Sequence, residues 1–92
     1  MFGPVPWTAF KLTSATGPHR RIVIRLYTSL EANVRLIVLR KRAVVTRSSR
    51  VVPLGTTTLR WRGMRPGRYV VKAEGRRMAE VRRTSRSVTV TR

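Results

Sequence analysis

The sequence contains no cysteine, and this absence excludes disulfide bonds, thiol nucleophiles and cysteine-ligated zinc sites. It also has few groups for acid–base work: one histidine, His19, and three acids, Glu31, Glu74 and Glu80. Isolated groups of this kind do not indicate a metal site or a catalytic pair, and no phosphate-binding or nucleophile motif occurs. We therefore expect a protein that is not an enzyme, with no catalytic residues, no metal and no cofactor.

Long apolar segments are also missing from the sequence. No run of 18 apolar residues occurs, so no segment is long enough to span a membrane as a helix. Residues 1–13 lack a basic stretch followed by an apolar one, so we do not expect a signal peptide there. Neither observation assigns a cellular compartment.

Positive charge is the feature present in excess. The chain has 21 basic residues against three acids, a net charge of +18, and 18 of the 21 are arginine. Such a field attracts polyanions, for example nucleic acid or anionic wall polymers. An arginine-rich composition also results from codon usage in a GC-rich genome, and these arginines are dispersed along the chain. Both interpretations stay open.

The pattern of apolar residues predicts an all-β fold in one domain. The 92 residues suffice for a single small core, and 41% of them are apolar, as in ordinary globular proteins. Apolar and polar residues alternate in short runs, with turn signals about every 8–12 residues, which is typical of a sandwich. We expect an irregular lead-in over 1–7, with Trp7 against the sandwich edge, and one domain over 8–92. The predicted strands are 8–14, 22–27, 34–39, 43–46, 50–52, two within 55–73, and a last one containing Val88 and Val90.

The stretch Gly55 to Ala73 carries the most specific signal. Leu59 and Trp61 alternate with arginines, a turn follows at Pro66-Gly67, and Tyr69 begins a second alternation. This run resembles the entry to the sixth strand of immunoglobulin-like and fibronectin type III-like domains. The resemblance implies a sandwich of about seven strands in which the tyrosine hydroxyl bonds back to the preceding corner. Trp61, Pro66, Gly67 and Tyr69 would form that structural corner.

A wider resemblance extends over residues 21–90. The order of motifs is similar to the Ig-like repeat of flagellar hook-capping proteins and of many bacterial surface proteins. The short insert before the tyrosine is closer to the fibronectin type III pattern. The resemblance implies a non-catalytic module that spaces, scaffolds or binds, commonly in an exported or cell-envelope protein. The matching motifs are Ile24-Arg25-Leu26, 32–38, Val44-Val45, Gly55, 59–63 and 67–73.

Three aliphatic residues fall on the outward phase of their predicted strands. If Val34 and its alternate neighbours face the core, then Ile37 and Leu39 face outward, and Val70 does so on the neighbouring strand. A large apolar patch on an outer face often marks an interface. We therefore predict that Ile37, Leu39 and Val70 contact a neighbouring domain, a protein partner or a second copy, unless arginine and lysine stems cover them.

The arginines divide into two candidate anion-binding groups. Arg25, Arg60 and Arg62 should share one outer face if the second and fifth strands pair. Arg76, Arg77, Arg82 and Arg83 crowd the segment 76–83, which we interpret as either a long basic hairpin loop or a loop running into a strand. Guanidinium groups suit phosphate and carboxylate oxygens, and no base-reading motif is present, so any nucleic-acid binding would be nonspecific.

The sequence thus supports two functions of different kinds. The first is a structural, adhesion or protein-binding sandwich, with neighbouring domains or a protein as partner. The alternative is a small basic protein that binds nucleic acid or another polyanion through its surface arginines.

Overall fold

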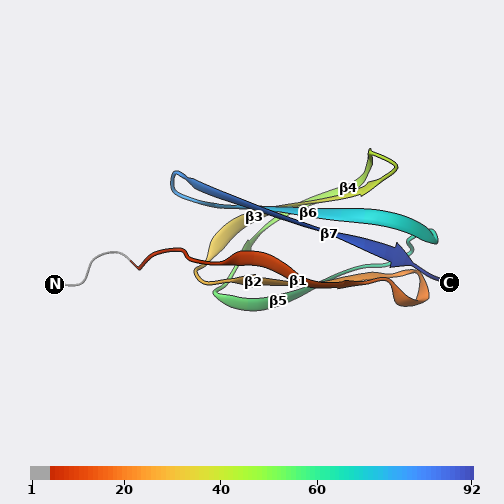
Figure 1. Ribbon diagram of the computed structural model, residues 1–92, viewed down its shortest axis with the longest axis horizontal. Coiled ribbons are helices and arrows are strands. Elements are labelled where there is room, and N and C mark those ends of the chain that lie inside the picture. Colours follow the sequence, from red (N-terminus) through yellow and green to blue (C-terminus); the bar gives the residue numbers. More distant parts are fainter. Residues whose placement is uncertain (1–4) are drawn as a thin grey trace.

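A computed structural model describes residues 5–92, and these fold into two antiparallel sheets packed face to face (Figure 1). One sheet has three strands in the order β1-β2-β5, and the other has four in the order β4-β3-β6-β7. The predicted all-β fold of about seven strands is confirmed. The strands are β1 (Phe10–Thr16), β2 (Ile22–Thr28), β3 (Ala32–Arg40), β4 (Ala43–Val52), β5 (Gly55–Trp61), β6 (Gly67–Arg77) and β7 (Glu80–Val90); a short 3-10 helix, η1, covers Pro18–Arg20.

The core lies between the sheets and is built from alternate residues of each strand. In β2, Ile22, Ile24 and Leu26 are fully buried, whereas the residues between them face outward. β3 and β6 show the same period of two. Because successive side chains of a strand point to opposite faces, this alternation determines which residues meet across the core. The buried residues contributed by β3, β4 and β6 are Ala32, Val34, Leu36, Val38, Val52, Tyr69, Val71 and Ala73.

The turn before β6 has the hydrogen bond that the tyrosine pattern implies. The hydroxyl of Tyr69 donates to the backbone carbonyl of Arg65 over 2.6 Å, and the ring is buried. Gly67 lies between them with a φ of 147°, in a region that side chains rarely adopt. The guanidinium of Arg40 stands 5.7 Å from the centre of the Tyr69 ring. These contacts hold the corner to the end of β3.

The segment 76–83 is not a long basic hairpin loop, and the alternative prediction, a loop running into a strand, is right only for the strand. β6 and β7 continue through it, and only Met78 and Ala79 form the turn that joins them. The strands pair from Gly67↔Val90 out to Arg77↔Glu80. Charged side chains do not prevent a strand when alternate positions face solvent, so the high charge was a poor indicator of a loop here.

The two predicted strands 43–46 and 50–52 are one strand, β4. It pairs with β3 from end to end except at Val45, where the register shifts, and the pairs include Leu36↔Ser48 and Arg35↔Ser49. The serines that favour a turn in isolation are held in the ladder by the long neighbouring strand. Pro53 follows the last residue of β4, and β4 is an edge strand, as predicted for this segment.

Hydrogen bonds made by β7 and the residue after it connect the four-stranded sheet to β1 and the residue after β1. The Leu12 amide donates to Thr84 Oγ1 over 3.2 Å, and Arg86 Nε donates to the Leu12 carbonyl over 2.9 Å. Beyond β1, the Thr91 amide donates to the Gly17 carbonyl over 2.8 Å. A Cβ on Gly17 would lie 2.8 Å from the Cα of Val90, so this close approach requires glycine.

The β3–β4 turn places two basic residues in an unfavourable conformation. Lys41 and Arg42 have φ values of 50° and 67°. Positive φ at both central residues characterises a type I′ turn, for which Asn-Gly is the preferred pair. A left-handed conformation costs roughly 1–2 kcal/mol for a residue with a side chain. Local preference therefore does not explain Lys41-Arg42 at this turn.

Removing the Tyr69 hydroxyl should destabilise the fold. We expect Tyr69→Phe to lower the free energy of unfolding by about 1–2 kcal/mol, since it leaves a corner carbonyl without its partner. Urea denaturation of the purified chain measures this. Tyr27→Phe is the control, because Tyr27 is half-buried on an outer face. Equal losses in the two variants would contradict a special role for the corner.

Replacing the basic turn should stabilise the fold. We expect Lys41→Asn with Arg42→Gly to raise the free energy of unfolding by about 1–2 kcal/mol through relief of the two positive φ angles. Lys41→Gln with Arg42→Gln removes the same charge without favouring the turn and should gain less. Thermal and urea unfolding measure the stability of the two variants. A similar gain in the free energy of unfolding for both variants would mean that relief of charge repulsion, and not of backbone strain, causes the effect.

Candidate functional site

The outer face of the three-stranded sheet gathers the first group of predicted arginines. The predicted pairing of the second and fifth strands is confirmed, since β2 and β5 pair from Ile22↔Trp61 to Thr28↔Gly55. Arg25 lies opposite Thr58, and Arg60 lies opposite Val23, both on the exposed side of the sheet. Arg62 is exposed directly beyond the end of β5. Lys11, exposed on β1, joins this face through its pairing with Tyr27, and sequence reasoning had not included it.

The outer face of the four-stranded sheet carries the predicted aliphatic patch. Leu39 and Val70 pair directly across β3 and β6, and both are half-buried. Val44 of β4, 43% exposed, pairs with Leu39 on its other side, so the apolar row spans three strands. Sequence reasoning missed Val44, because the register of β4 against β3 is not visible in the alternation of a short segment.

A shallow hollow lies over Leu39 and Val70. Its volume is about 770 Å³, and it is also bordered by Tyr69 and Val88, whose side chains are buried in the core. Its remaining lining is basic or hydroxylic: Lys41, Arg42, Arg68, Lys72, Ser87 and Thr89. We call this site the Leu39–Val70 hollow.

Ile37 lies on the same outer face of β3, two residues before Leu39. It pairs with Lys72 and lines a separate hollow of about 540 Å³. Arg35, Glu74 and Arg83 also line that hollow. Lys72 borders both hollows, so the three predicted residues share one outer face but line two neighbouring hollows in it.

The four arginines of the β6–β7 hairpin point in different directions. Arg76 and Arg83 both approach Glu74, at 3.5 Å and 3.1 Å. Arg77 donates instead to the backbone carbonyl of Glu31. Arg82 lies on the inward phase of β7, opposite Gly75. The hairpin therefore does not present these four guanidinium groups as one surface.

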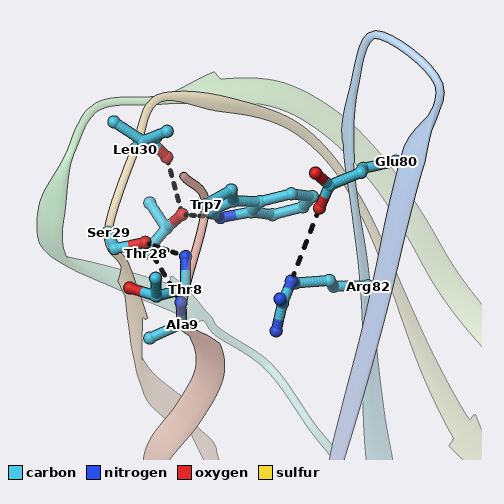
Figure 2. Close-up of polar contacts among 8 residues, drawn as sticks. All are labelled: Trp7, Thr8, Ala9, Thr28, Ser29, Leu30, Glu80 and Arg82. Carbon is cyan, nitrogen blue, oxygen red and sulfur yellow. Dashed lines mark hydrogen bonds and ion pairs between the residues drawn. The ribbon is translucent and has the colours of Figure 1, made fainter. Parts of the chain in front are cut away.

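Arg82 packs on the buried Trp7 (Figure 2). Its guanidinium carbon is 5.5 Å from the centre of the indole, within the range of a cation–π interaction. Its Nε atom is 3.9 Å from a carboxylate oxygen of Glu80, an ion-pair distance that is too long for a hydrogen bond. The sequence offered no signal for this contact, since it joins residues from opposite ends of the chain.

Trp7 itself is fixed by hydrogen bonds to the β2–β3 connection (Figure 2). The indole Nε1 donates to Thr28 Oγ1 over 2.9 Å, and that hydroxyl donates to the Leu30 carbonyl over 2.6 Å. The amides of Thr8 and Ala9 both donate to Ser29 Oγ, at 2.9 Å and 3.1 Å. Residues 5–9 form no strand, yet these bonds hold them to the sandwich.

The ionisable groups outside these surfaces do not assemble. Within residues 5–92, no three His, Cys, Asp or Glu side chains come together where they could hold a metal ion. His19 is exposed in η1 with a φ of 53°. This part of the chain also contains no helix long and apolar enough to cross a membrane.

Two neighbouring arginines of β7 should differ in their contribution to stability. We expect Arg82→Ala to lower the free energy of unfolding by about 1 kcal/mol, since it removes the cation–π contact and uncovers Trp7. Arg83→Ala removes the same charge but only an exposed ion pair and should cost about 0.5 kcal/mol or less. Urea denaturation of both variants checks this. A larger loss for Arg83→Ala would contradict the packing role of Arg82.

Comparison with known proteins bears on the fold. No family model matches the chain, and no curated protein sequence matches it. Among solved structures, it is similar to an engineered protein with a TM-score of 0.73 and 16% sequence identity. The aligned region covers 98% of this chain and 21% of that one, so the chain spans about a fifth of that protein's length. The sandwich of three and four strands is therefore a fold it shares with a solved structure.

Proposed function

We propose that the chain is a fibronectin type III-like domain that acts as a non-catalytic protein-binding module. The Leu39–Val70 hollow would be its binding surface. The strand order supports this type of sandwich, because β4 pairs with β3. In immunoglobulin constant-type domains the fourth strand joins the other sheet. The hydrogen bond from Tyr69 to the carbonyl four residues earlier supports the same family.

The single observation that carries the binding function is the composition of the hollow. Its floor is apolar, formed by Leu39 and Val70, and four cations surround it. An apolar floor favours the burial of a partner's aliphatic or aromatic side chain, at about 1.5–3 kcal/mol for each such side chain. The cations Lys41, Arg42, Arg68 and Lys72 favour acidic residues beside it. The surface thus fits an acidic peptide segment with one or two apolar anchors.

The strained β3–β4 turn supports this assignment independently. Lys41 and Arg42 occupy positions that Asn-Gly would fill at lower energy, and both line the hollow. Unfavourable backbone conformations are concentrated at functional sites, where side-chain identity outweighs local stability. If binding requires two cations beside the apolar floor, this requirement accounts for Lys41 and Arg42 at the two positions of positive φ.

The layout of the chain suits a module within a longer assembly. The described chain enters at one end of the sandwich, ahead of β1, and leaves at the opposite end after β7 (Figure 1). We extend the proposal to the setting that the resemblance to hook-capping Ig-like repeats implies, a structural or adhesion role in an exported or envelope protein.

Selection of peptides from a displayed random library tests this function. We expect the recovered sequences to combine Asp or Glu with Leu, Ile or Phe, and to lose binding as salt rises. Leu39→Thr with Val70→Thr should weaken the selected peptides at least tenfold. Thr is chosen because it keeps the strand preference of these positions.

The matched control lies on the same sheet. Val51 and Val81 are 56% and 37% exposed on the outer phase of β4 and β7, away from the hollow. Val51→Thr with Val81→Thr should leave peptide binding within about twofold of the original chain. The hollow would be rejected as the binding surface if the selected peptides bound the Leu39 and Val70 variant as tightly as the original chain. It would also be rejected if the control variant lost as much peptide affinity as that variant.

A further inference from the structure

The opposite outer face, that of the three-stranded sheet, carries an ordered row of cations. From Arg62, which lies directly beyond the end of β5, the cations continue to Arg60 on β5, Arg25 on β2 and Lys11 on β1, the last three in successive rows of the β1-β2-β5 ladder. Each step moves by one two-residue row, and the last two steps also move to the next strand. All four residues are exposed. We call Lys11, Arg25, Arg60 and Arg62 the cationic stripe.

The stripe has a regular spacing. Two residues along a strand span about 6.6 Å, and neighbouring strands lie about 4.8 Å apart. Successive cations of the stripe are therefore separated by about 7–8 Å at the backbone. Long flexible side chains can adjust this separation to the phosphate of each successive nucleotide in an extended strand.

No acidic residue accompanies the stripe in the described part of the chain. Glu74 lies on the outer phase of β6 in the other sheet, where Arg76 and Arg83 approach it. Glu80 begins β7, and Glu31 lies in the β2–β3 connection. No carboxylate therefore offsets the positive potential along the stripe, which favours the approach of a polyanion.

An aromatic ring lies beside the stripe. Tyr27 occupies the same row as Lys11 and follows Arg25 by two residues, on the same face of β2. It is half-buried, so its ring is anchored while part of it stays accessible. A ring next to a line of cations is the arrangement that binds single strands without sequence preference, since every base can stack on it.

We propose that this face binds single-stranded nucleic acid. The cationic stripe contacts successive phosphates, and Tyr27 stacks on a base. The site is separate from the Leu39–Val70 hollow and does not rest on the proposed protein-binding function. Within residues 5–92, the face has no helix or hairpin that could enter a groove and read base edges, so binding is independent of sequence. Because the contacts are to phosphates, binding depends strongly on salt.

A salt series with a labelled 20-nucleotide oligo-dT and the full chain tests the stripe. Arg25→Gln with Arg60→Gln removes two stripe cations and should weaken binding at least tenfold. It should also reduce the slope of log affinity against log salt by about 1.4, since each single-strand phosphate contact contributes about 0.7. Arg47→Gln with Arg50→Gln on the exposed edge strand β4 removes the same charge and should change affinity less than threefold. Equal losses of oligo-dT affinity in the two double variants would overturn the proposal, because binding would then depend on the net positive charge and not on the stripe.

A second variant separates nucleic acid from other polyanions. We expect Tyr27→Leu to weaken oligo-dT binding about fivefold or more, the low end of base–aromatic stacking. The same variant should leave the affinity for heparin, a sulfated polysaccharide without bases, unchanged. Unchanged oligo-dT binding by Tyr27→Leu, or tighter binding of heparin than of oligo-dT at equal salt, would assign the stripe to an anionic polysaccharide and overturn the proposal.

Discussion

The burial of alternate aliphatic side chains between two sheets is the interaction on which the rest of this structure depends. No disulfide is available to a chain without cysteine, so this small core must hold the fold against its own net charge of +18. Ile22, Ile24 and Leu26 on one sheet and Val34, Leu36 and Val38 on the other supply it. The same alternation sends the basic residues outward, so the core and the charged surface are two results of one pattern.

The two outer faces differ because the chain distributes its few acids and outward aliphatics unevenly. The four-stranded face combines apolar residues, cations and Glu74. The three-stranded face has cations, hydroxyls, Val23 and one tyrosine, and no acid within the described residues. A sandwich leaves both faces free, since its core lies between the sheets. One small domain can therefore present two chemically different surfaces.

Much of the fold could be predicted from residues that are close in sequence. The alternation of β2 and the Pro66-Gly67 turn before Tyr69 are local patterns, and the shared face of Arg25 and Arg60 follows once β2 and β5 pair. The failures came from long-range effects. Ser48 and Ser49 are held extended by β3, and the β6–β7 ladder keeps a highly charged segment in strands. Local propensity predicts secondary structure poorly where a long neighbouring strand supplies the hydrogen bonds.

The sequence by itself determined the all-β class, the approximate number of strands and which residues face inward, because these depend on a period of two within single segments. Only the tertiary structure decided which outward residues meet. It placed Val44 beside Leu39 and Val70, placed Lys11 in line with the arginines, and turned Arg82 onto Trp7. These contacts depend on register and strand order. Both arise from packing between segments far apart in the chain, and no single segment encodes them.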